Sequence, residues 1–221
     1  MTMNAIIESL PFLLKGFGYT VWLSICCVVV SVIVGVIVGV LRTLENTVIR
    51  LASKVFIDVF RGIPTLVVLF LVFFLLPTIG FQIPNFLSAL IGLSLWAIAN
   101  VAEAVRGSIQ SIPKTQTEVS YALGLNYVNT MMYVIIPQAT KRVLPSIIGI
   151  LTNLVQSTSL TVLIGNVEFL KSAQITIERI TMMGSNNTAV FMLYTLVLAG
   201  YFIICYPLSL WSRNLENRLK V

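Results

Sequence analysis

The chain has 221 residues, of which 57% are hydrophobic and only 10% are charged, whereas about a quarter of the residues in soluble domains are charged. This composition excludes an ordinary soluble domain and predicts one membrane domain over residues 1–221. The net charge of +6 indicates basic cytoplasmic loops, and not a nucleic-acid-binding surface.

The sequence also lacks the residues that several kinds of chemistry need. It has no His, the commonest general base and metal ligand. Cys26, Cys27 and Cys205 lie inside apolar runs, which predicts buried, inert thiols and no metal site. No phosphate-binding loop of the G-x-x-x-x-G-K-S/T type occurs, so any ATP must be handled by another chain. We therefore expect no catalytic residue, metal or cofactor in this chain.

Apolar runs predict an all-α, polytopic membrane protein with five transmembrane helices, because about 20 apolar residues cross a bilayer as a helix. Apolar spacing at 3–17 first predicts a short interfacial helix. The predicted spans are then residues 19–41, 57–76, 85–105, 143–164 and 188–211. Gly35 and Gly39 form a small-xxx-small pattern that lets helices approach closely. Pro64 should kink the second span or mark its start.

The polar region at 115–137 predicts two short amphipathic helices joined by a sharp turn. Thr115 and Glu118, three residues apart, form the capping-box pattern of a helix start. The apolar positions of this first helix are Val119, Ala122 and Leu123. Gly124 fits the left-handed position that follows a helix C-terminus.

The second helix of this region is predicted to begin at Asn126, which can cap it, and to close at Pro137. Its apolar positions are Tyr127, Met131 and Val134. A later connection, residues 165–187, is mildly amphipathic and ends in turn-forming residues at 184–187.

The distribution of basic residues predicts the orientation. Eleven of the 14 Lys and Arg residues fall in the first connection, the central polar region or the C-terminal tail. The positive-inside rule places these segments in the cytoplasm. The N-terminus is then outside, and both the C-terminus and the two-helix loop are cytoplasmic.

Polar residues inside the predicted spans have two interpretations each. Glu103 either faces a translocation path, where it would meet an ammonium group, or pairs with Arg106 one turn later. Asp58 and Arg61 favour a local pair of the same kind. A stripe in the fourth span either lines the path or forms hydrogen bonds between and within helices, and we favour the path. Its members are Thr152, Asn153, Gln156, Ser157 and Ser159.

The central loop resembles the cytoplasmic EAA loop of ABC importer permeases, in which Glu-Ala-Ala is followed by three residues, Gly, nine residues and Ile-x-Leu-Pro. Here Glu118, Gly124 and Val134 to Pro137 keep the spacing, while Val119 and Ser120 replace the alanines. The resemblance implies that the loop docks into a groove on an ATP-hydrolysing subunit. The implied docking residues are Glu118, Ala122, Leu123, Gly124, Leu125 and Pro137. An ordinary surface hairpin of helices is the alternative.

Further segments, in the right order over about residues 15–215, are similar to the polar amino-acid uptake (histidine/glutamine/arginine-type) branch of these permeases. They are Arg61-Gly62-Ile63-Pro64, Ala102-Glu103 with Arg106-Gly107, Pro137-Gln138-Ala139, Leu144-Pro145, Thr158-Ser159-Leu160 and Ile164-Gly165. Many members carry Lys and Asp where this sequence has Gln156 and Ser157, so the family's charged pair is absent here.

The resemblance implies the transmembrane subunit of an ATP-driven importer for polar amino acids in a bacterial cytoplasmic (inner) membrane. Its implied partners are ABC ATP-binding subunits, a second permease subunit, identical or homologous, and an external (periplasmic) solute-binding protein. The alternative is a secondary transporter or channel for small polar solutes. That class needs coupling-ion sites and usually an internal repeat, and five unlike spans with few charges argue against it. An intramembrane enzyme would lack a nucleophile–base pair.

Overall fold

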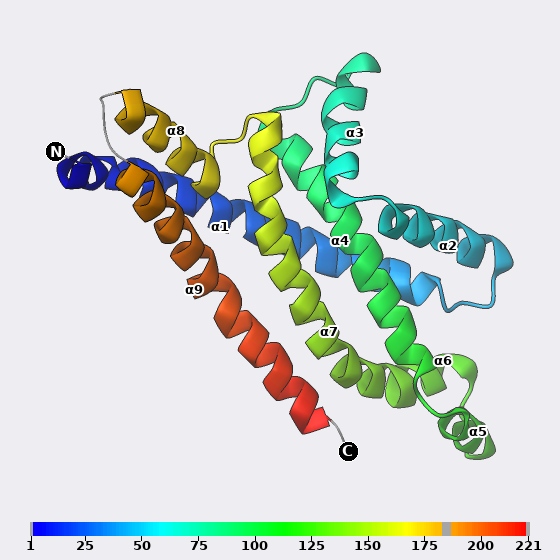
Figure 1. The fold of residues 1–221 in the computed structure, drawn as a ribbon. Coiled ribbons are helices and arrows are strands. Elements are labelled where there is room, and N and C mark those ends of the chain that lie inside the picture. Colours follow the sequence, from blue (N-terminus) through cyan, green and yellow to red (C-terminus); the bar gives the residue numbers. More distant parts are fainter. Residues whose placement is uncertain (1, 183–186, 220–221) are drawn as a thin grey trace. The chain divides into compact units, whose positions relative to one another are not determined.

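The structure, a computed structural model, describes residues 2–182 and 187–219, and within them the regular structure is helical with no strand (Figure 1). The elements are α1 (Thr2–Leu41), α2 (Thr47–Gly62), α3 (Thr65–Thr78), α4 (Asn85–Gln110), α5 (Lys114–Ala122), α6 (Tyr127–Thr130), a π-helical turn (Met131–Ile135), α7 (Ile136–Ser157), a 3₁₀ segment (Thr158–Ile164), α8 (Phe169–Met182) and α9 (Asn187–Leu219). The all-α prediction is confirmed. Residues 184–186 of the predicted turn lie outside the described residues.

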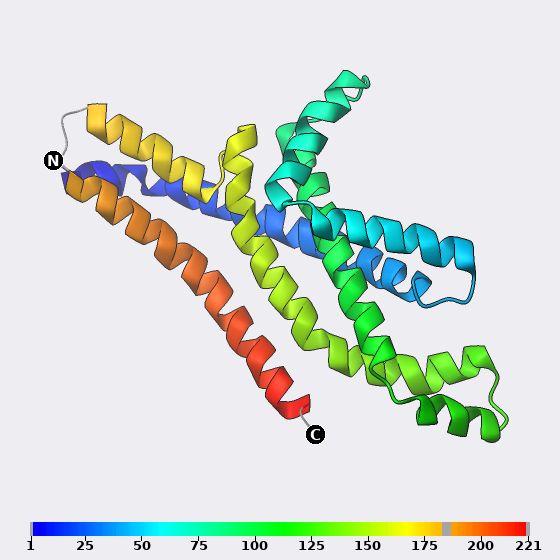
Figure 2. The ribbon, with the colours of Figure 1, turned by 45° about the vertical axis from the view of Figure 1, so that its right-hand side comes forward.

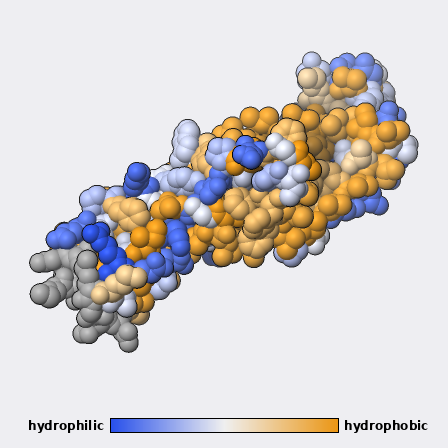
Figure 3. Space-filling view, turned by 90° about the horizontal axis from the view of Figure 1, so that it is seen from above, coloured by the Kyte–Doolittle hydropathy of each residue, from blue (hydrophilic) through white to orange (hydrophobic). Residues whose placement is uncertain are grey.

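Four stretches of the described helices are long and apolar enough to cross a membrane, or five if α2 and α3 count as one broken span. They are Ile6–Leu41, Asn85–Gln110, Tyr127–Ile164 and Thr188–Leu219. Hydrophobic residues cover much of the surface visible in Figure 3, as expected of helices that face lipid. The predicted polytopic membrane fold is confirmed.

The interfacial helix predicted at 3–17 is not a separate element. It continues into the first span, and α1 runs unbroken for 40 residues. Gly16 and Gly18 do not end the helix, because one glycine costs only about 1 kcal/mol in a helix interior. Gly16 instead lets α1 lie close to α8, since a Cβ at this position would overlap Ser172.

The second predicted span, 57–76, is divided at Pro64, as expected of a proline that kinks the span or marks its start. It is broken between α2 and α3, where Ile63 is extended (φ −96°, ψ 134°). Pro64 explains the break, because its ring disfavours a helical conformation of the preceding residue. With 14 residues, α3 is about 21 Å long at about 1.5 Å per residue, which is shorter than the hydrocarbon core of about 30 Å.

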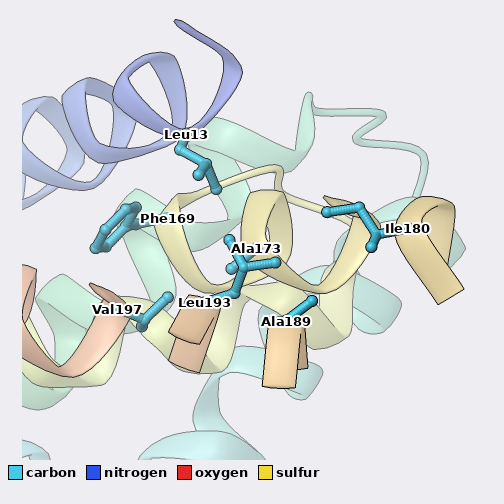
Figure 4. Close-up of a cluster of buried hydrophobic side chains, with 7 residues drawn as sticks. All are labelled: Leu13, Phe169, Ala173, Ile180, Ala189, Leu193 and Val197. Atoms are coloured by element: carbon cyan, nitrogen blue, oxygen red, sulfur yellow. The ribbon is translucent and has the colours of Figure 1, made fainter. Parts of the chain in front are cut away.

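The chain forms two compact units, which are described separately. The first contains residues 1–28, 64–94 and 152–207. Its buried cluster lies where α1, α8 and α9 meet (Figure 4). The cluster comprises Leu13, Phe169, Ala173, Ile180, Ala189, Leu193 and Val197. Phe17 adds an edge-to-face contact with Phe169 at 5.2 Å between ring centroids.

The second unit contains residues 29–63, 95–151 and 208–221. Its buried cluster joins α4 to α7 and consists of Val101, Val105, Val143 and Ile147. Gly35 and Gly39 of α1 lie directly against α4. A Cβ at Gly35 would be 2.7 Å from the Val101 Cβ, and one at Gly39 would be 2.6 Å from the Ala102 carbonyl oxygen. The close helix approach predicted from the small-xxx-small pattern is confirmed.

Candidate functional site

The turn after α5 has the geometry that the sequence predicts. Gly124 has φ +82°, a left-handed conformation that side chains other than glycine rarely adopt. The Gly124 N–H donates to the Tyr121 carbonyl (2.9 Å), and the Leu125 N–H donates to the Ser120 carbonyl (3.0 Å). These two bonds form a Schellman motif, which satisfies the last carbonyls of α5.

The start of α5 differs from the prediction. The helix begins at Lys114 after Pro113, and no side chain caps it. Thr115 therefore lies inside the first turn, and the predicted capping box with Glu118 is not formed. Pro113 accounts for the earlier start, because its φ of −57° already suits a helix and it has no N–H that needs a partner.

The second helix begins as predicted, since the Asn126 side chain accepts a hydrogen bond of 2.8 Å from the Asn129 N–H. Its predicted end at Pro137 is wrong. The helix passes through the π turn Met131–Ile135 directly into α7. In the π turn the Ile136 N–H bonds the Met131 carbonyl five residues earlier. This wider turn accommodates Pro137, which has no N–H for the carbonyl four residues before it.

The inner face of this loop is packed. In Figures 1 and 2, α5 lies beside the α6–π-turn segment. Ile112, Ile135 and Ala139 form a buried cluster, against which Met131 and Val134 pack. Of the three apolar positions predicted to share a face, Met131 and Val134 pack inward, whereas Tyr127 is 37% exposed. The loop therefore has a small core of its own.

The outer face of the loop carries large apolar side chains that are exposed. The exposed fraction is 77% for Leu123, 63% for Val128 and 72% for Tyr133. We call these residues, together with Val119 and Met132, the loop apolar surface. Exposed apolar surfaces of this kind mark sites of interaction with another protein or with lipid.

The residues predicted for docking lie on or beside the loop apolar surface. Glu118, Ala122, Leu123, Gly124 and Pro137 are exposed, and Leu125 is half-buried. Sequence reasoning missed Val128, Met132 and Tyr133. A signal was present for Met132 and Tyr133, because helical spacing places them away from the inward-facing Met131 and Val134. Spacing does not indicate the exposure of Val128, which is three residues before Met131.

The structure brings Glu103 together with two arginines. The Arg106 guanidinium donates to both carboxylate oxygens of Glu103, at 2.8 Å and 2.6 Å, and Arg61 lies 3.5 Å from the same carboxylate. The pairing of Glu103 with Arg106 is therefore formed. The expected local pair of Asp58 with Arg61 is not formed in the described residues, where the ion pair of Arg61 is with Glu103.

The polar stripe of α7 divides into two groups. Asn153 and Gln156 are exposed and three residues apart, so they share a helix face. The Ser157 hydroxyl donates to the Asn153 carbonyl (2.8 Å), and the Ser159 hydroxyl donates to the Gln156 carbonyl (2.7 Å). The two serines thus bond back to their own helix. Thr152 is buried. The Gln156 side chain also forms a hydrogen bond with Cys205, and the role of the two amides along a path stays a prediction.

Glu168 is a polar centre that sequence reasoning missed. Its side chain is fully buried just before α8. The carboxylate accepts hydrogen bonds from the Leu170 and Lys171 N–H groups, both at 2.8 Å, and from the Tyr201 hydroxyl at 2.9 Å. The Thr20 hydroxyl lies at 3.4 Å. Burial raises the pKa of Glu168, and the two backbone N–H bonds oppose that rise.

Glu168 links three helices in this way. It caps the N-terminus of α8 and contacts α1 and α9 through Thr20 and Tyr201. The available signal was a carboxylate within an otherwise apolar stretch, immediately before a helix. Buried carboxylates need such partners, because an unpaired buried charge is very costly.

Comparisons with known proteins give one consistent result. Residues 31–221 match the family model described as "Binding-protein-dependent transport system inner membrane component". The probable amino-acid ABC transporter permease protein YckA of Bacillus subtilis is 32% identical over 96% of this chain and 91% of its own. The glutamine transport system permease protein GlnP of Escherichia coli is 31% identical over 99% of this chain and 97% of its own.

Solved structures agree with these relatives. A crystal structure of an amino acid ABC transporter with histidines has a TM-score of 0.83 and 26% identity, covering 96% of this chain and 97% of that one. A chain of the inward-facing MetNI methionine ABC transporter has a TM-score of 0.72 and 19% identity, covering 96% and 98%. The second likeness concerns the fold alone.

Proposed function

The chain belongs to the family of binding-protein-dependent transport system inner membrane components, and on this premise we propose that it is the transmembrane subunit of an ATP-driven ABC importer for polar amino acids. The relatives named as amino-acid and glutamine permeases support this substrate class. The importer works in the bacterial inner membrane, with the N-terminus of this chain outside and its C-terminus in the cytoplasm.

The observation that carries the coupling role is the loop apolar surface around Gly124. Leu123, Val128 and Tyr133 are each more than half exposed, although the loop has its own buried cluster at Ile112 and Ile135. A loop that is folded inside and apolar outside is suited to insert into another protein. We assign this surface to a groove on a partner ATP-binding subunit, with Glu118 and Pro137 at its edges.

ATP and Mg²⁺ bind the partner subunit in this proposal, and the chemistry of hydrolysis stays there. Closure of two such subunits moves the loop, and the loop moves the membrane helices between two states. A second permease subunit, identical or homologous, completes the path, and an external solute-binding protein delivers the amino acid.

Asn153 and Gln156 of α7 are the proposed path-lining residues, because their amides are exposed on one helix face. An amide both donates and accepts hydrogen bonds, so it can replace water around a zwitterionic solute. Ser157 and Ser159 donate their hydroxyl hydrogens to their own helix, so they can offer the solute hydrogen-bond acceptors only. Glu103 anchors the inner end of α4 through Arg106 and Arg61.

The docking role is tested with Leu123→Asp. Leu123 is 77% exposed, so the charge leaves the fold of this chain intact but enters the proposed interface. We expect the ATP-binding subunit to be lost on co-purification. The matched control is Met182→Asp at the end of α8, where the side chain is 87% exposed. Equal recovery of the ATPase with both variants would refute the docking role.

Coupling is tested with Gly124→Val. Valine resists the left-handed backbone at φ +82°, at a cost of about 1–2 kcal/mol. We expect membrane insertion to persist, while ATP hydrolysis no longer drives uptake. Gly80→Val is the control, because Gly80 has φ +91° and lies in the turn between α3 and α4. Normal uptake by Gly124→Val in reconstituted vesicles would contradict the proposal.

A further inference from the structure

A basic cavity lies beside the loop, at the end of α1. Its volume is about 520 Å³, within the usual range of small-molecule sites, about 300–1,000 Å³. The charged residues among its lining are Arg42, Arg50 and Lys114, and no Asp or Glu lines it. Glu103 pairs with Arg61 and Arg106 and also attracts Arg42 electrostatically, so positive charge is in excess around the cavity. The cavity is therefore suited to an anion.

Thr130 gives a second, independent indication of a ligand. Its side chain is 1% exposed and lines the same cavity. Its hydroxyl has no hydrogen-bond partner among the described residues. A buried hydroxyl normally has a partner, because leaving it unpaired is costly. An oxygen of a bound anion inside the cavity would supply that partner.

An apolar groove adjoins the basic cavity. Its volume is about 240 Å³. It is lined by residues of α1, α4 and α7 that include Val36, Val40, Val105, Ala139, Val143 and Ile147. Ile109 lines both the groove and the cavity. Ile135 of the cavity is followed in the chain by Ile136 of the groove. The two spaces therefore share Ile109 as a lining residue.

A basic cavity beside an apolar groove suits an anion that also has an apolar chain. We propose that the cavity and the groove together bind one anionic phospholipid. Its phosphate lies among Arg42, Arg50 and Lys114, and accepts a hydrogen bond from the Thr130 hydroxyl. One acyl chain lies along Val36, Val40 and Val143. The membrane itself supplies such lipids, and basic pockets beside transmembrane helices bind their headgroups.

The proposal goes beyond transport and depends only on the location of the chain in a membrane. A free phosphate or nucleotide would use the same basic residues but would leave the groove empty. An acidic segment of a partner subunit would also use the basic residues. Two observations distinguish these occupants. One is whether filling the groove abolishes binding, and the other is which molecule becomes cross-linked to the chain.

The experiment uses the protein purified in its membrane complex and placed in vesicles. A phosphatidylglycerol with a photoactivatable acyl chain is compared with the matching phosphatidylcholine, and labelled peptides are located by mass spectrometry. We expect phosphatidylglycerol to label peptides within 136–147 several-fold more strongly than phosphatidylcholine. Equal labelling by the two lipids would overturn the proposal.

Variants identify the contacts. The pair Arg42→Gln and Arg50→Gln should reduce phosphatidylglycerol labelling to the phosphatidylcholine level. The control pair Arg213→Gln and Arg218→Gln removes the same charge from exposed positions of α9 and should leave labelling unchanged. Thr130→Val, a change close in shape, should reduce labelling several-fold. The assignment would be contradicted if the control pair lost labelling, or if the pair Arg42→Gln and Arg50→Gln kept the labelling of the unchanged protein.

The groove is tested separately. Val36→Trp fills it while the three basic residues stay in place, and we expect labelling to fall to the phosphatidylcholine level. Free glycerol phosphate at millimolar concentration should not compete. Competition by glycerol phosphate would identify a soluble anion site, and attachment of the basic residues to a partner's acidic peptide would identify a protein contact. Either result would refute a bound lipid.

Discussion

The contact of α1 with α4 at Gly39 provides the sharpest test of the packing. An added Cβ at Gly39 would lie 2.6 Å from the Ala102 carbonyl oxygen and 2.7 Å from the Val105 Cβ. Ordinary van der Waals contact begins at 3.4 Å, so Gly39→Ala is 0.8 Å too close to a backbone atom, which cannot rotate away. Overpacking of this kind costs about 1–3 kcal/mol.

Gly18→Ala is the matched control, because it lies on the same helix with nothing within 4 Å of the added Cβ. Both changes gain about 1 kcal/mol of helix propensity, so their difference measures packing alone. At about 2–4 °C per kcal/mol for a chain of this size, we expect Gly39→Ala to melt about 2–12 °C below Gly18→Ala.

Melting of the two purified variants is followed in the same detergent by intrinsic fluorescence. Gly35→Ala should behave like Gly39→Ala, since its Cβ would be 2.7 Å from the Val101 Cβ. If Gly39→Ala were as stable as Gly18→Ala, the close approach of α1 and α4 at this position would be refuted.

Three further predictions concern polar groups. Burial raises the pKa of Glu168, so its contribution to stability is complete below the unfolded pKa of about 4.3 and is lost as pH rises through the folded pKa. The melting temperature should therefore fall as pH rises from the unfolded to the folded pKa of Glu168, and Glu168→Gln should remove this dependence on pH. If the variant kept the same dependence, another group would be its cause. Glu103→Gln should lower stability by about 1 kcal/mol or less while the KM for uptake stays constant, because the carboxylate is held by Arg106 and Arg61; a raised KM would instead indicate contact with the solute. Asn126→Ala should cost about 1 kcal/mol of capping, seen as faster hydrogen exchange in residues 127–135, whereas Asn126→Ser should restore protection; no difference between the two would argue against the cap.

Features that depend on near neighbours in the chain could be predicted from the sequence. The turn at Gly124 and the cap at Asn126 depend on bonds between residues at most five positions apart, so the local pattern identifies both. The sequence predicted that another helix approaches Gly39 closely, because small residues at this spacing permit close approach. Its partner on α4 could not be named.

Features that depend on distant residues or on competing local rules could not be predicted. The role of Glu168 depends on Thr20, 148 positions earlier. Pro137 was expected to end a helix, as proline usually does, but the π turn before it provides the extra space. The start of α5 was assigned to Thr115 by its side chain, whereas the backbone of Pro113 determines it. The exposure of Val128 and Tyr133 depends on the packing of their neighbours against Ile112.

The π turn at Met131–Ile135 has a mechanical consequence. Because α6, this turn and α7 follow one another without a loop, a twist applied at Asn126 is carried along a single rod into the bilayer. The rod is least stiff where the ladder of i to i−4 bonds is interrupted, at the widened turn and at Pro137. Torsional compliance is therefore concentrated at the start of α7, so that a rotation of α6 is converted there into a tilt of α7.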